Sequence, residues 1–389
     1  MRPRPSAALP EPGADARAHS ARVVEAVRRE VEAAGGWIAF ADYMQTVLYG
    51  PGLGYYMGGS RKLGAAGDFV TAPEMTPLYA QALADPIAAI LDRSDSRDVL
   101  ELGAGSGALA ADLLDTLADR GASPARYRIL EVSPELRERQ RARMTARTSH
   151  DGVAIEWLDR IPDEIHGAVV MNEVLDAIPV HVVSRTDGHW FERGVAWHEE
   201  LQWEDRALAA GTLLDLAQAR FPAGGNYTSE LNPDAEALVE TLARRTASGA
   251  ILIVDYGFPQ AEFYHPQRDA GTLMGHYRHR AHADPFLWPG LSDLTAHVDF
   301  TAMALSGERG DLAVAGYGPL AAFLLASGIL ERLESVGDPA SAAYLREAAA
   351  VQRLLSPAEM GELFKVMVLA KSDGIVSAYF AFADRTHRL

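Results

Sequence analysis

Three glycines at alternate positions directly follow a short apolar run in this 389-residue sequence. The run Asp98–Leu102 (DVLEL) leads into Gly103, Gly105 and Gly107, and a helical pattern follows from Ala108. Glycines in a strand-to-helix turn let the backbone approach a ligand closely, and the helix N-terminus presents free N–H groups. The pattern predicts a nucleotide-type cofactor site, although Gly103, Gly105 and Ala108 also satisfy the dinucleotide fingerprint.

The carboxylates near this turn favour S-adenosylmethionine over a dinucleotide. Glu101 precedes the glycines, where it can meet the positively charged amino-acid end of S-adenosylmethionine but would repel a pyrophosphate. Glu131 ends the next predicted strand and can bind the ribose hydroxyls of either cofactor. Asp159 lies just past a third strand, where it can bind the adenine amino group. For Glu131 and Asp159 the alternative is a solvated loop carboxylate.

A second group of polar residues lies in the segment Met171–His181 (MNEVLDAIPVH), directly after an apolar run. In an open α/β sheet this position faces the ligand crevice, so we expect Asn172 to contact the cofactor. Methyl transfer from a sulfonium is an in-line displacement, and carboxylates can orient the N–H groups of an amine or guanidine nucleophile. Glu173 and Asp176 are therefore the predicted catalytic pair. The alternative is that they cap a following helix.

The segment Gly271–Phe300 contains a third group and is expected to be a mobile or semi-ordered lid beside the cofactor. Its three histidines at steps of three are His276, His279 and His282. Steps of three drift around a helix and no carboxylate completes a zinc motif, so a metal site is disfavoured. His297 and Asp299 either position or deprotonate a substrate or form a buried hydrogen-bonded pair.

Strands and helices alternate from residue 98, which predicts an α/β fold with a mostly parallel sheet and helices on both faces. The predicted sheet strands cover residues 98–102, 127–132, 153–158, 167–172 and 251–257, with two more around residues 372–374. A β-hairpin is predicted between residues 182 and 204, with its turn at Thr186-Asp187-Gly188.

The expected domain organisation follows from these patterns. Residues 1–19 are proline-rich and form a disordered lead-in, and residues 20–95 form an N-terminal annex of helices and loops. Residues 96–389 form the cofactor domain, with insertions at about 182–247 and 258–300. Five arginines crowd the helix predicted after residue 133, which is typical of a solvated helix face rather than a binding patch.

Composition excludes several classes of function. The formal net charge of −17 opposes binding to a nucleic-acid backbone, and the absence of cysteine excludes disulfides and thiolate chemistry. No apolar run of about 18 residues predicts a transmembrane helix. The N-terminal residues include no apolar signal region, so the expected location is the cytoplasm.

Several motifs occur in order along the chain: GDFVTAPE at residues 67–74, ELGAGSG at 101–107, NEVLDAIPVH at 172–181, VDYG at 254–257 and DLTAHVDF at 293–300. Together they resemble the MidA-type methyltransferase family, whose mitochondrial members are assembly factors for respiratory complex I. The resemblance implies a class I (Rossmann-like) methyltransferase fold with a seven-stranded sheet. It also implies that the cofactor is bound by Asp68, Thr71, Glu74, Glu101, Gly103, Gly105, Gly107 and Glu131.

The resemblance further implies protein arginine methylation, which in the mitochondrial relatives acts on a complex I subunit. The leading expectation is therefore methyl transfer to an arginine side chain of a partner protein. The alternatives are a small-molecule methyltransferase, an assembly protein that uses S-adenosylmethionine only structurally, and a nicotinamide dehydrogenase, which the other motifs disfavour. The sequence does not decide whether the protein forms a homodimer.

Overall fold

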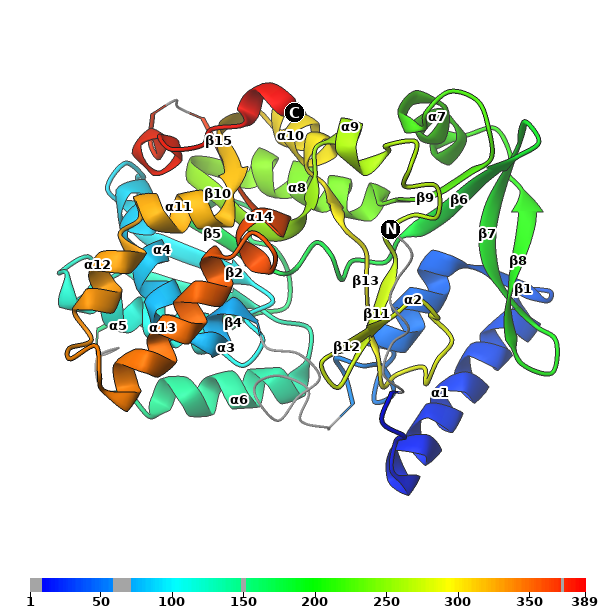
Figure 1. Cartoon of the computed structure of the whole chain (residues 1–389), viewed down its shortest axis with the longest axis horizontal. Coiled ribbons are helices and arrows are strands. Elements are labelled where there is room, and N and C mark those ends of the chain that lie inside the picture. The colour runs from blue at the N-terminus through cyan, green and yellow to red at the C-terminus, as the bar shows by residue number, and fades with distance from the viewer. Residues whose placement is uncertain (1–8, 59–70, 148–151, 372–373) are drawn as a thin grey trace. The chain divides into compact units, whose positions relative to one another are not determined.

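A computed structural model describes residues 9–58, 71–147, 152–371 and 374–389 (Figure 1). The chain forms two compact units, each assembled from three segments. Unit 1 comprises Met1–Val70, Asp176–Ala235 and Gln260–His297, and unit 2 comprises Thr71–Leu175, Glu236–Pro259 and Val298–Leu389. The helix expected near residues 76–91 therefore belongs to unit 2, although the sequence pattern places it in the N-terminal annex.

Unit 2 contains a sheet whose main path is β15-β16-β10-β5-β2-β3-β4, with the short strand β14 (Val298–Asp299) pairing with β10. Only β16 runs antiparallel to its neighbours, so the sheet is mostly parallel, as predicted. The seven strands are β2 (Asp98–Leu102), β3 (Arg126–Leu130), β4 (Ala154–Leu158), β5 (Ile165–Asn172), β10 (Thr246–Phe258), β15 (Ala313–Pro319) and β16 (Phe364–Ala370).

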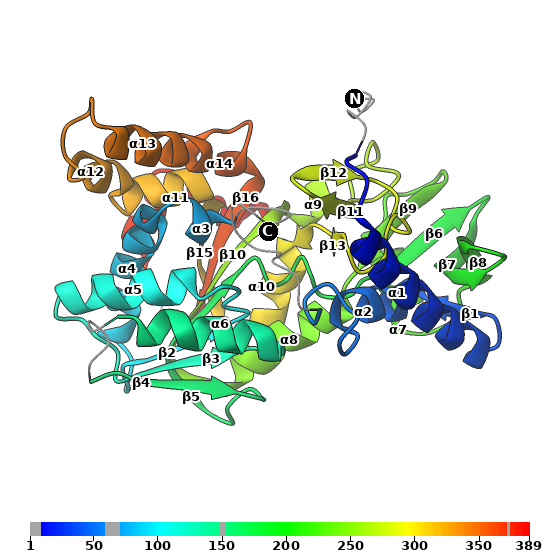
Figure 2. The same ribbon diagram turned by 90° about the horizontal axis from the view of Figure 1, so that it is seen from below.

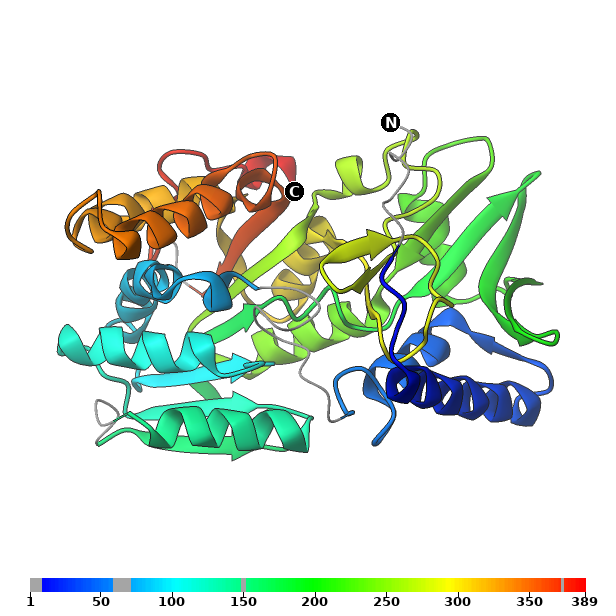
Figure 3. The same ribbon diagram turned by 60° about the horizontal axis from the view of Figure 1, so that its bottom comes forward.

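Helices cover both faces of this sheet, which explains why its central strands are apolar on both sides. On one face Val170 and Leu252 share a core cluster with Leu83 of α4 (Pro77–Leu91) and Leu113 of α5 (Ala108–Asp119). On the other face α10 (Phe300–Arg309) contacts β10, β15 and β16. Figure 3 shows α5 and α6 (Pro134–Thr145) running alongside the strands β2 to β4. The predicted doubly wound arrangement is confirmed.

The C-terminal region of unit 2 differs from the prediction of two strands around residues 372–374. Residues 364–370 form β16, but Ser377–Phe380 form a short 3-10 helix instead of a second strand. The partner of β16 at the sheet edge is β15, whose sequence AVAGYGP has few residues that favour strands. Gly316 of β15 lies so close to the ring of Phe380 that a Cβ there would clash, so this glycine allows the 3-10 helix to pack against the edge strand.

Unit 1 contains an antiparallel sheet of five strands, in which the predicted hairpin forms the centre. Asp187 and Gly188 at the hairpin turn have φ values of 51° and 81°, as a type I′ turn requires. The strands are β1 (Trp37–Ala39), β6 (His181–Thr186), β7 (His189–Trp197), β8 (Leu201–Ala207) and β9 (Tyr227–Leu231). Two helices, α1 (Ala14–Ala33) and α2 (Phe40–Tyr49), pack against β7 (Figure 2).

The helix α1 begins inside the stretch 1–19 that the sequence predicts to be a disordered lead-in. Gly13 is extended at the N-cap, and residues 14–19 are part of the helix, where alanine at positions 14, 16 and 18 favours helical backbone. The remaining helices are α3 (Ala72–Met75), α7 (Thr212–Arg220), α8 (Pro233–Arg245), α9 (Gln260–Phe263), α11 (Leu320–Ala326), α12 (Ile329–Glu334), α13 (Ala342–Leu355) and α14 (Met360–Leu363). None of the helices in the described ranges is long and apolar enough to cross a membrane.

The segment 271–300, expected to be a mobile or semi-ordered lid, contains a regular three-stranded sheet in unit 1. Its strands β11 (Met274–Tyr277), β12 (Arg280–His282) and β13 (Asp293–Thr295) pair in the order β12-β11-β13. The phenol of Tyr43 donates a hydrogen bond of 2.7 Å to the carbonyl of Pro285, which ties the segment to α2. The sequence gave no clear strand signal here, because the strands are too short to show a clear alternation.

Candidate functional site

The glycine turn of unit 2 connects β2 to α5, as the sequence predicts. Gly103, Gly105 and Gly107 have φ values of 61°, 53° and 78°, in the left-handed region that favours glycine. Gly107 is the N-cap of α5, and a Cβ at this position would lie 3.3 Å from the Cα of Gln140. The turn therefore brings backbone N–H groups to the carboxyl end of β2, where an open α/β sheet binds its ligands.

Glu101 is buried beneath this turn. Its Oε2 atom accepts a hydrogen bond of 2.6 Å from the phenol of Tyr127 on the neighbouring strand β3. Burial raises the pKa of Glu101 to about 7, against the opposing effect of this hydrogen bond, and the nearby charge of Glu131 adds to the rise. A cation bound beside Glu101 would favour the ionised carboxylate, because opposite charges at close range lower an acid's pKa.

Glu131 follows β3 and is buried rather than being a solvated loop carboxylate. Its Oε1 atom accepts from the Ser133 amide at 2.9 Å, and its Oε2 atom accepts from the Gln140 side chain at 3.0 Å. The same Gln140 amide donates to the Gly105 carbonyl at 2.9 Å, while its oxygen accepts from the indole of Trp157. Gln140 thus joins the glycine turn to the acidic residue that is predicted to bind ribose.

The helix α3 places Glu74 against the glycine turn. Ser106, between the last two glycines, donates a hydrogen bond to the Oε1 atom of Glu74. Arg143 of α6 donates to the Ser106 hydroxyl at 2.9 Å and lies 3.4 Å from the Glu74 carboxylate. Thr71 is the N-cap of α3, and its carbonyl accepts from the Glu74 amide. Asp68, predicted to bind the cofactor, lies outside the described residues.

Asp159, the acid that is predicted to bind the adenine amino group, lies at the surface. Its side chain is 88% exposed, and its carboxylate forms an ion pair of 2.7 Å with Arg137 of α6. Among the described residues, the predicted adenine-binding acid is therefore paired at the surface, where solvent competes for it.

Asn172 and Glu173 lie at the carboxyl end of β5, where three side chains form a hydrogen-bonded chain. The phenol of Tyr79 donates to Asn172 Oδ1 at 2.5 Å, and Asn172 Nδ2 donates to Glu173 Oε1 at 3.1 Å. Glu173 has a φ of 53°, a strained backbone conformation for a residue with a side chain. No helix follows Glu173 directly, so the helix-cap alternative does not apply to it.

A buried carboxylate on β10 holds the loop that follows Glu173. Asp255 Oδ2 accepts from the amides of Val174 and Leu175, at 3.2 and 2.9 Å.

Burial, together with the charges of Glu173 and Asp255, raises the pKa of Tyr79 well above its usual value, so this phenol stays protonated and acts as a donor. Tyr79 and Asp255 were not selected as site residues from the sequence; the Asp255 carboxylate directly after an apolar strand was the available signal.

Two pairs of residues were predicted to act together, and in each pair one residue belongs to unit 1 and the other to unit 2. Glu173 belongs to unit 2 and Asp176 to unit 1, where the Asp176 carbonyl accepts from the Ala296 amide at 3.0 Å. His297 ends the third segment of unit 1, and its backbone N–H donates to the Thr272 hydroxyl at 3.1 Å. Asp299 belongs to unit 2 and caps α10 by accepting from the Ala302 amide. A helix-capping role for Asp299 was not predicted.

The three histidines lie on a β-hairpin instead of a helix. His276 and His282 are on β11 and β12, and His279 is in the turn between them with a φ of 61°. Burial lowers the pKa of His276 to about 4, with a further contribution from His282. In the part of the chain that the structure describes, no group of three or more His, Cys, Asp or Glu residues is arranged to hold a metal ion.

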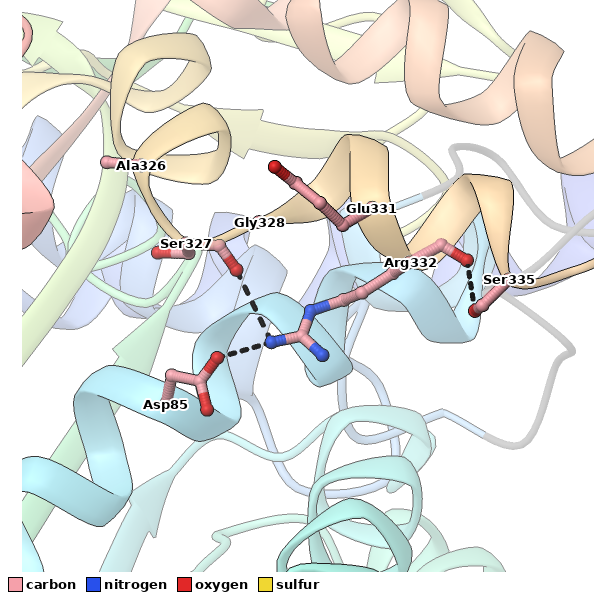
Figure 4. Close-up of a pocket in the computed structure, with 7 residues that line it drawn as sticks. All are labelled: Asp85, Ala326, Ser327, Gly328, Glu331, Arg332 and Ser335. Atoms are coloured by element: carbon pink, nitrogen blue, oxygen red, sulfur yellow. Dashed lines mark hydrogen bonds and ion pairs between the residues drawn. The ribbon is translucent and has the colours of Figure 1, made fainter.

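Unit 2 also has a surface pocket that shares no residue with the glycine turn (Figure 4). Arg332 of α12 reaches across it to form an ion pair with Asp85 of α4, and it donates a second bond to the Ser327 carbonyl. Arg120 pairs with the same carboxylate, and Glu331 also lines the pocket. The two arginines and two acids balance in charge, so the pocket has no marked preference for a charged ligand.

Comparisons with known proteins agree with this geometry. Residues 82–318 match the model of a family described as "Putative S-adenosyl-L-methionine-dependent methyltransferase". The chain is 31% identical to a mitochondrial protein arginine methyltransferase, NDUFAF7, from Danio rerio, over 85% of this chain and 83% of that protein. It is 30% identical to the Rattus norvegicus protein of the same name, over 86% and 81% of the two chains.

Two solved structures are similar over nearly the whole chain. A crystal structure of a Burkholderia thailandensis protein bound to S-adenosyl-homocysteine superposes with a TM-score of 0.92 and 46% identity, covering 98% of this chain and all of that one. A native crystal structure from Burkholderia thailandensis gives a TM-score of 0.90 and 45% identity, again over 98% and 100% of the two chains. The first of these relatives holds the product that remains after S-adenosylmethionine has donated its methyl group.

Proposed function

Because this chain belongs to the S-adenosyl-L-methionine-dependent methyltransferase family matched by residues 82–318, we propose that it methylates arginine side chains of a partner protein. The predicted class I methyltransferase fold and the predicted cofactor are both confirmed, since the similar Burkholderia thailandensis structure contains S-adenosyl-homocysteine. The choice of arginine is a proposal. Relatives at about 30% identity that are named protein arginine methyltransferases support it.

The residues around the glycine turn fit this cofactor. Gly103, Gly105 and Gly107 carry no side chain and have left-handed backbone, so the chain can approach a ligand closely at these three positions. Glu101 offers a buried carboxylate for a cationic amino group, and Glu131 offers a buried carboxylate for the ribose hydroxyls. When bound, S-adenosylmethionine supplies an electrophilic methyl group on a sulfonium. We propose that Thr71, Glu74 and Asn172 line the same site.

The observation that carries the proposal for arginine is the hydrogen-bonded chain from Tyr79 through Asn172 to Glu173. One carboxylate oxygen of Glu173 is held by Asn172, so the carboxylate has a defined direction. A guanidinium is planar and presents several N–H donors, which suits bidentate pairing with a carboxylate. A strained, oriented acid at the carboxyl end of a central strand is thus suited to hold an arginine and to stabilise its charge during transfer.

The positive φ of Glu173 indicates that its position serves more than packing. Its backbone N–H donates to the Val254 carbonyl at 2.9 Å, and Asp255 holds the next two amides. These bonds offset the strain of the left-handed backbone and keep the side chain in one place. We propose that Asp176 and His297 are further residues that contact the acceptor, and that the partner to test first is a subunit of respiratory complex I, as the resemblance implies.

Two other functions predict different experimental results. A small-molecule methyltransferase would leave the protein arginines of the cell unchanged. An assembly protein that uses the cofactor only structurally would bind it without turnover.

The proposal is tested by comparing cell proteins with and without this gene by mass spectrometry, scanning arginines for added methyl groups. We expect at least one arginine to lose methylation in the absence of the gene and to regain it when the wild-type gene is restored. The variant Glu173→Gln should bind S-adenosylmethionine with unchanged affinity in a calorimetric titration but should not restore methylation. The matched control Glu156→Gln, at an exposed position of β4, should restore it fully.

If no arginine changes, the acceptor is not a protein arginine. If Glu173→Gln restores methylation as well as the wild type, Glu173 does not orient the acceptor.

A further inference from the structure

Unit 1 contains a pair of stacked tyrosines whose hydroxyls are fixed in direction. The rings of Tyr49 and Tyr56 lie 5.4 Å apart with an interplanar angle of 24°. The Tyr49 phenol donates to the Ala177 carbonyl at 3.0 Å, and the Tyr56 phenol donates to Asp293 Oδ1 at 2.9 Å. Both side chains are only half-buried, so part of this aromatic pair remains accessible.

Two buried carboxylates lie near the Tyr56 hydroxyl. Asp293 of β13 is 2% exposed and Asp176 is 6% exposed. Burial is the largest cause that raises the pKa of Tyr56 well above its usual value, and both negative charges add to the rise. Asp176 is held next to β13 because its carbonyl accepts from the Ala296 amide. The two acids therefore face one phenol from two separate chain segments.

The face of β13 that carries Asp293 has a further polar group. Side chains alternate along a strand, so Thr295 points to the same face as Asp293, whereas Leu294 points to the opposite face and joins the apolar core of unit 1. Thr295 is 3% exposed, and its hydroxyl has no hydrogen-bond partner among the residues that the structure describes. A buried hydroxyl without a partner is costly, and a ligand with N–H groups would satisfy it.

The cross-strand neighbour of Asp293 adds no positive charge to this face. His276 of β11 pairs with Asp293 in the sheet register, so the two side chains share a face. Its pKa of about 4, lowered by burial and by His282, leaves the imidazole neutral near pH 7. The face thus combines carboxylates, a hydroxyl and a neutral imidazole, which suits a bound cation better than an anion.

We propose that Tyr49, Tyr56, Asp176 and Asp293 form a subsite of unit 1 that binds the guanidinium group of an arginine side chain, with the Thr295 hydroxyl as an additional acceptor. A guanidinium stacks on aromatic faces and donates several hydrogen bonds in one plane, which matches a tyrosine pair bordered by two carboxylates. The proposal rests on the proposed function, because a partner protein whose arginines are methylated carries the cationic side chain that this subsite would bind.

The subsite is tested by binding of two small probes to the full chain saturated with S-adenosyl-homocysteine, observed by ligand-detected NMR. The probes are Nα-acetylarginine methylamide and Nα-acetylcitrulline methylamide, which have the same shape but differ in charge. We expect the wild type to prefer the arginine probe, and Asp293→Asn to weaken that probe's affinity about ten-fold or more without affecting the citrulline probe. Tyr56→Phe should weaken the arginine probe less, because it removes only one hydroxyl.

Two matched variants serve as controls. Asp187→Asn changes an exposed acid in the hairpin turn of unit 1, and Tyr227→Phe removes a phenol that donates to the His265 carbonyl. Both should bind the arginine probe as the wild type does. If Asp293→Asn does not fold, the Tyr56→Phe variant and the comparison of the two probes on the wild type decide the question. Equal binding of the two probes, or unchanged arginine binding in both variants, would overturn the subsite.

A second measurement separates this proposal from the proposed function. The wild type and the variants are incubated with labelled S-adenosylmethionine and protein extract from cells lacking the gene, and the labelled amino acid is identified after hydrolysis. Label on arginine that persists at the wild-type rate in Asp293→Asn supports the function and refutes the subsite. Absence of label on arginine, together with a preference for the arginine probe that depends on Asp293, refutes the function and retains the subsite as a cation site.

Discussion

Replacing Glu101 by glutamine should stabilise the protein above neutral pH. Glu101 is buried, and its pKa is raised from the usual 4.5 to about 7, mainly by burial. Between pH 4.5 and about pH 7, Glu101 keeps its proton in the folded chain and releases it in the unfolded chain. The resulting contribution to stability is complete below pH 4.5 and is lost as the pH rises through about 7. At about 1.4 kcal/mol for each pH unit, the loss amounts to about 3 kcal/mol.

The variant Glu101→Gln removes this ionisation but retains an oxygen that can accept the hydrogen bond from Tyr127. We expect its free energy of unfolding to equal that of the wild type near pH 4.5 and to exceed it by up to about 3 kcal/mol at pH 8. Urea unfolding monitored by tryptophan fluorescence at several pH values measures the difference directly. The control Glu138→Gln changes an exposed acid of α6 and should alter stability by no more than about 0.5 kcal/mol at any pH.

The same substitution should weaken binding of S-adenosylmethionine. If the ionised Glu101 carboxylate meets the cationic end of the cofactor, affinity in the wild type should rise from pH 6 to pH 8, whereas affinity in Glu101→Gln should be lower and nearly independent of pH. Calorimetric titration at the two pH values gives both affinities.

A stability difference between wild type and Glu101→Gln that does not change with pH, or a variant less stable than the wild type at pH 8, would refute the role of burial in raising this pKa.

Three further substitutions test the site of unit 2. Gly107→Ala puts a Cβ on a residue with a φ of 78° and 3.3 Å from Gln140, so cofactor affinity and stability should both fall, the latter by about 1 kcal/mol or more in urea unfolding. Tyr79→Phe removes the donor to Asn172 and should lower kcat while the Kd of the cofactor in calorimetry stays unchanged. Asp255→Asn replaces an acceptor of two backbone amides with an amide group, and we expect a loss of about 1–3 kcal/mol in urea unfolding.

Several features of the site could be predicted from the sequence because they depend on residues close together in the chain. A run of buried strand residues followed by alternating glycines and a helix predicts a strand-to-helix turn, and Gly103, Gly105 and Gly107 do connect β2 to α5. The hairpin turn at Asp187-Gly188 was predictable for the same reason. The burial of Glu101 followed from its place in a strand of apolar residues.

Other features depended on contacts between distant segments. Arg143 is one of five arginines on a helix face that the sequence predicts to be solvated. It nevertheless contacts Ser106 and Glu74, because α6 packs beside the turn. Asp159, which the sequence predicts to bind the adenine, forms an ion pair with Arg137 at the surface, and the sequence spacing gave no sign of this pair. No local pattern distinguishes an arginine that reaches the glycine turn from one that remains in solvent.

The sequence alone therefore determined the class of fold, the glycine turn and the acids at the ends of the first strands, since local backbone geometry and apolar patterning set these features. The tertiary structure decided how those acids are held. Tyr127 and Gln140 fix Glu101 and Glu131, and Tyr79 fixes Asn172 and Glu173 through a chain of hydrogen bonds. It also divided Glu173 from Asp176, because the chain passes from one unit to the other between Leu175 and Asp176. Hydrogen bonds between residues many positions apart form only when the whole chain is packed, so their partners are not visible in sequence spacing.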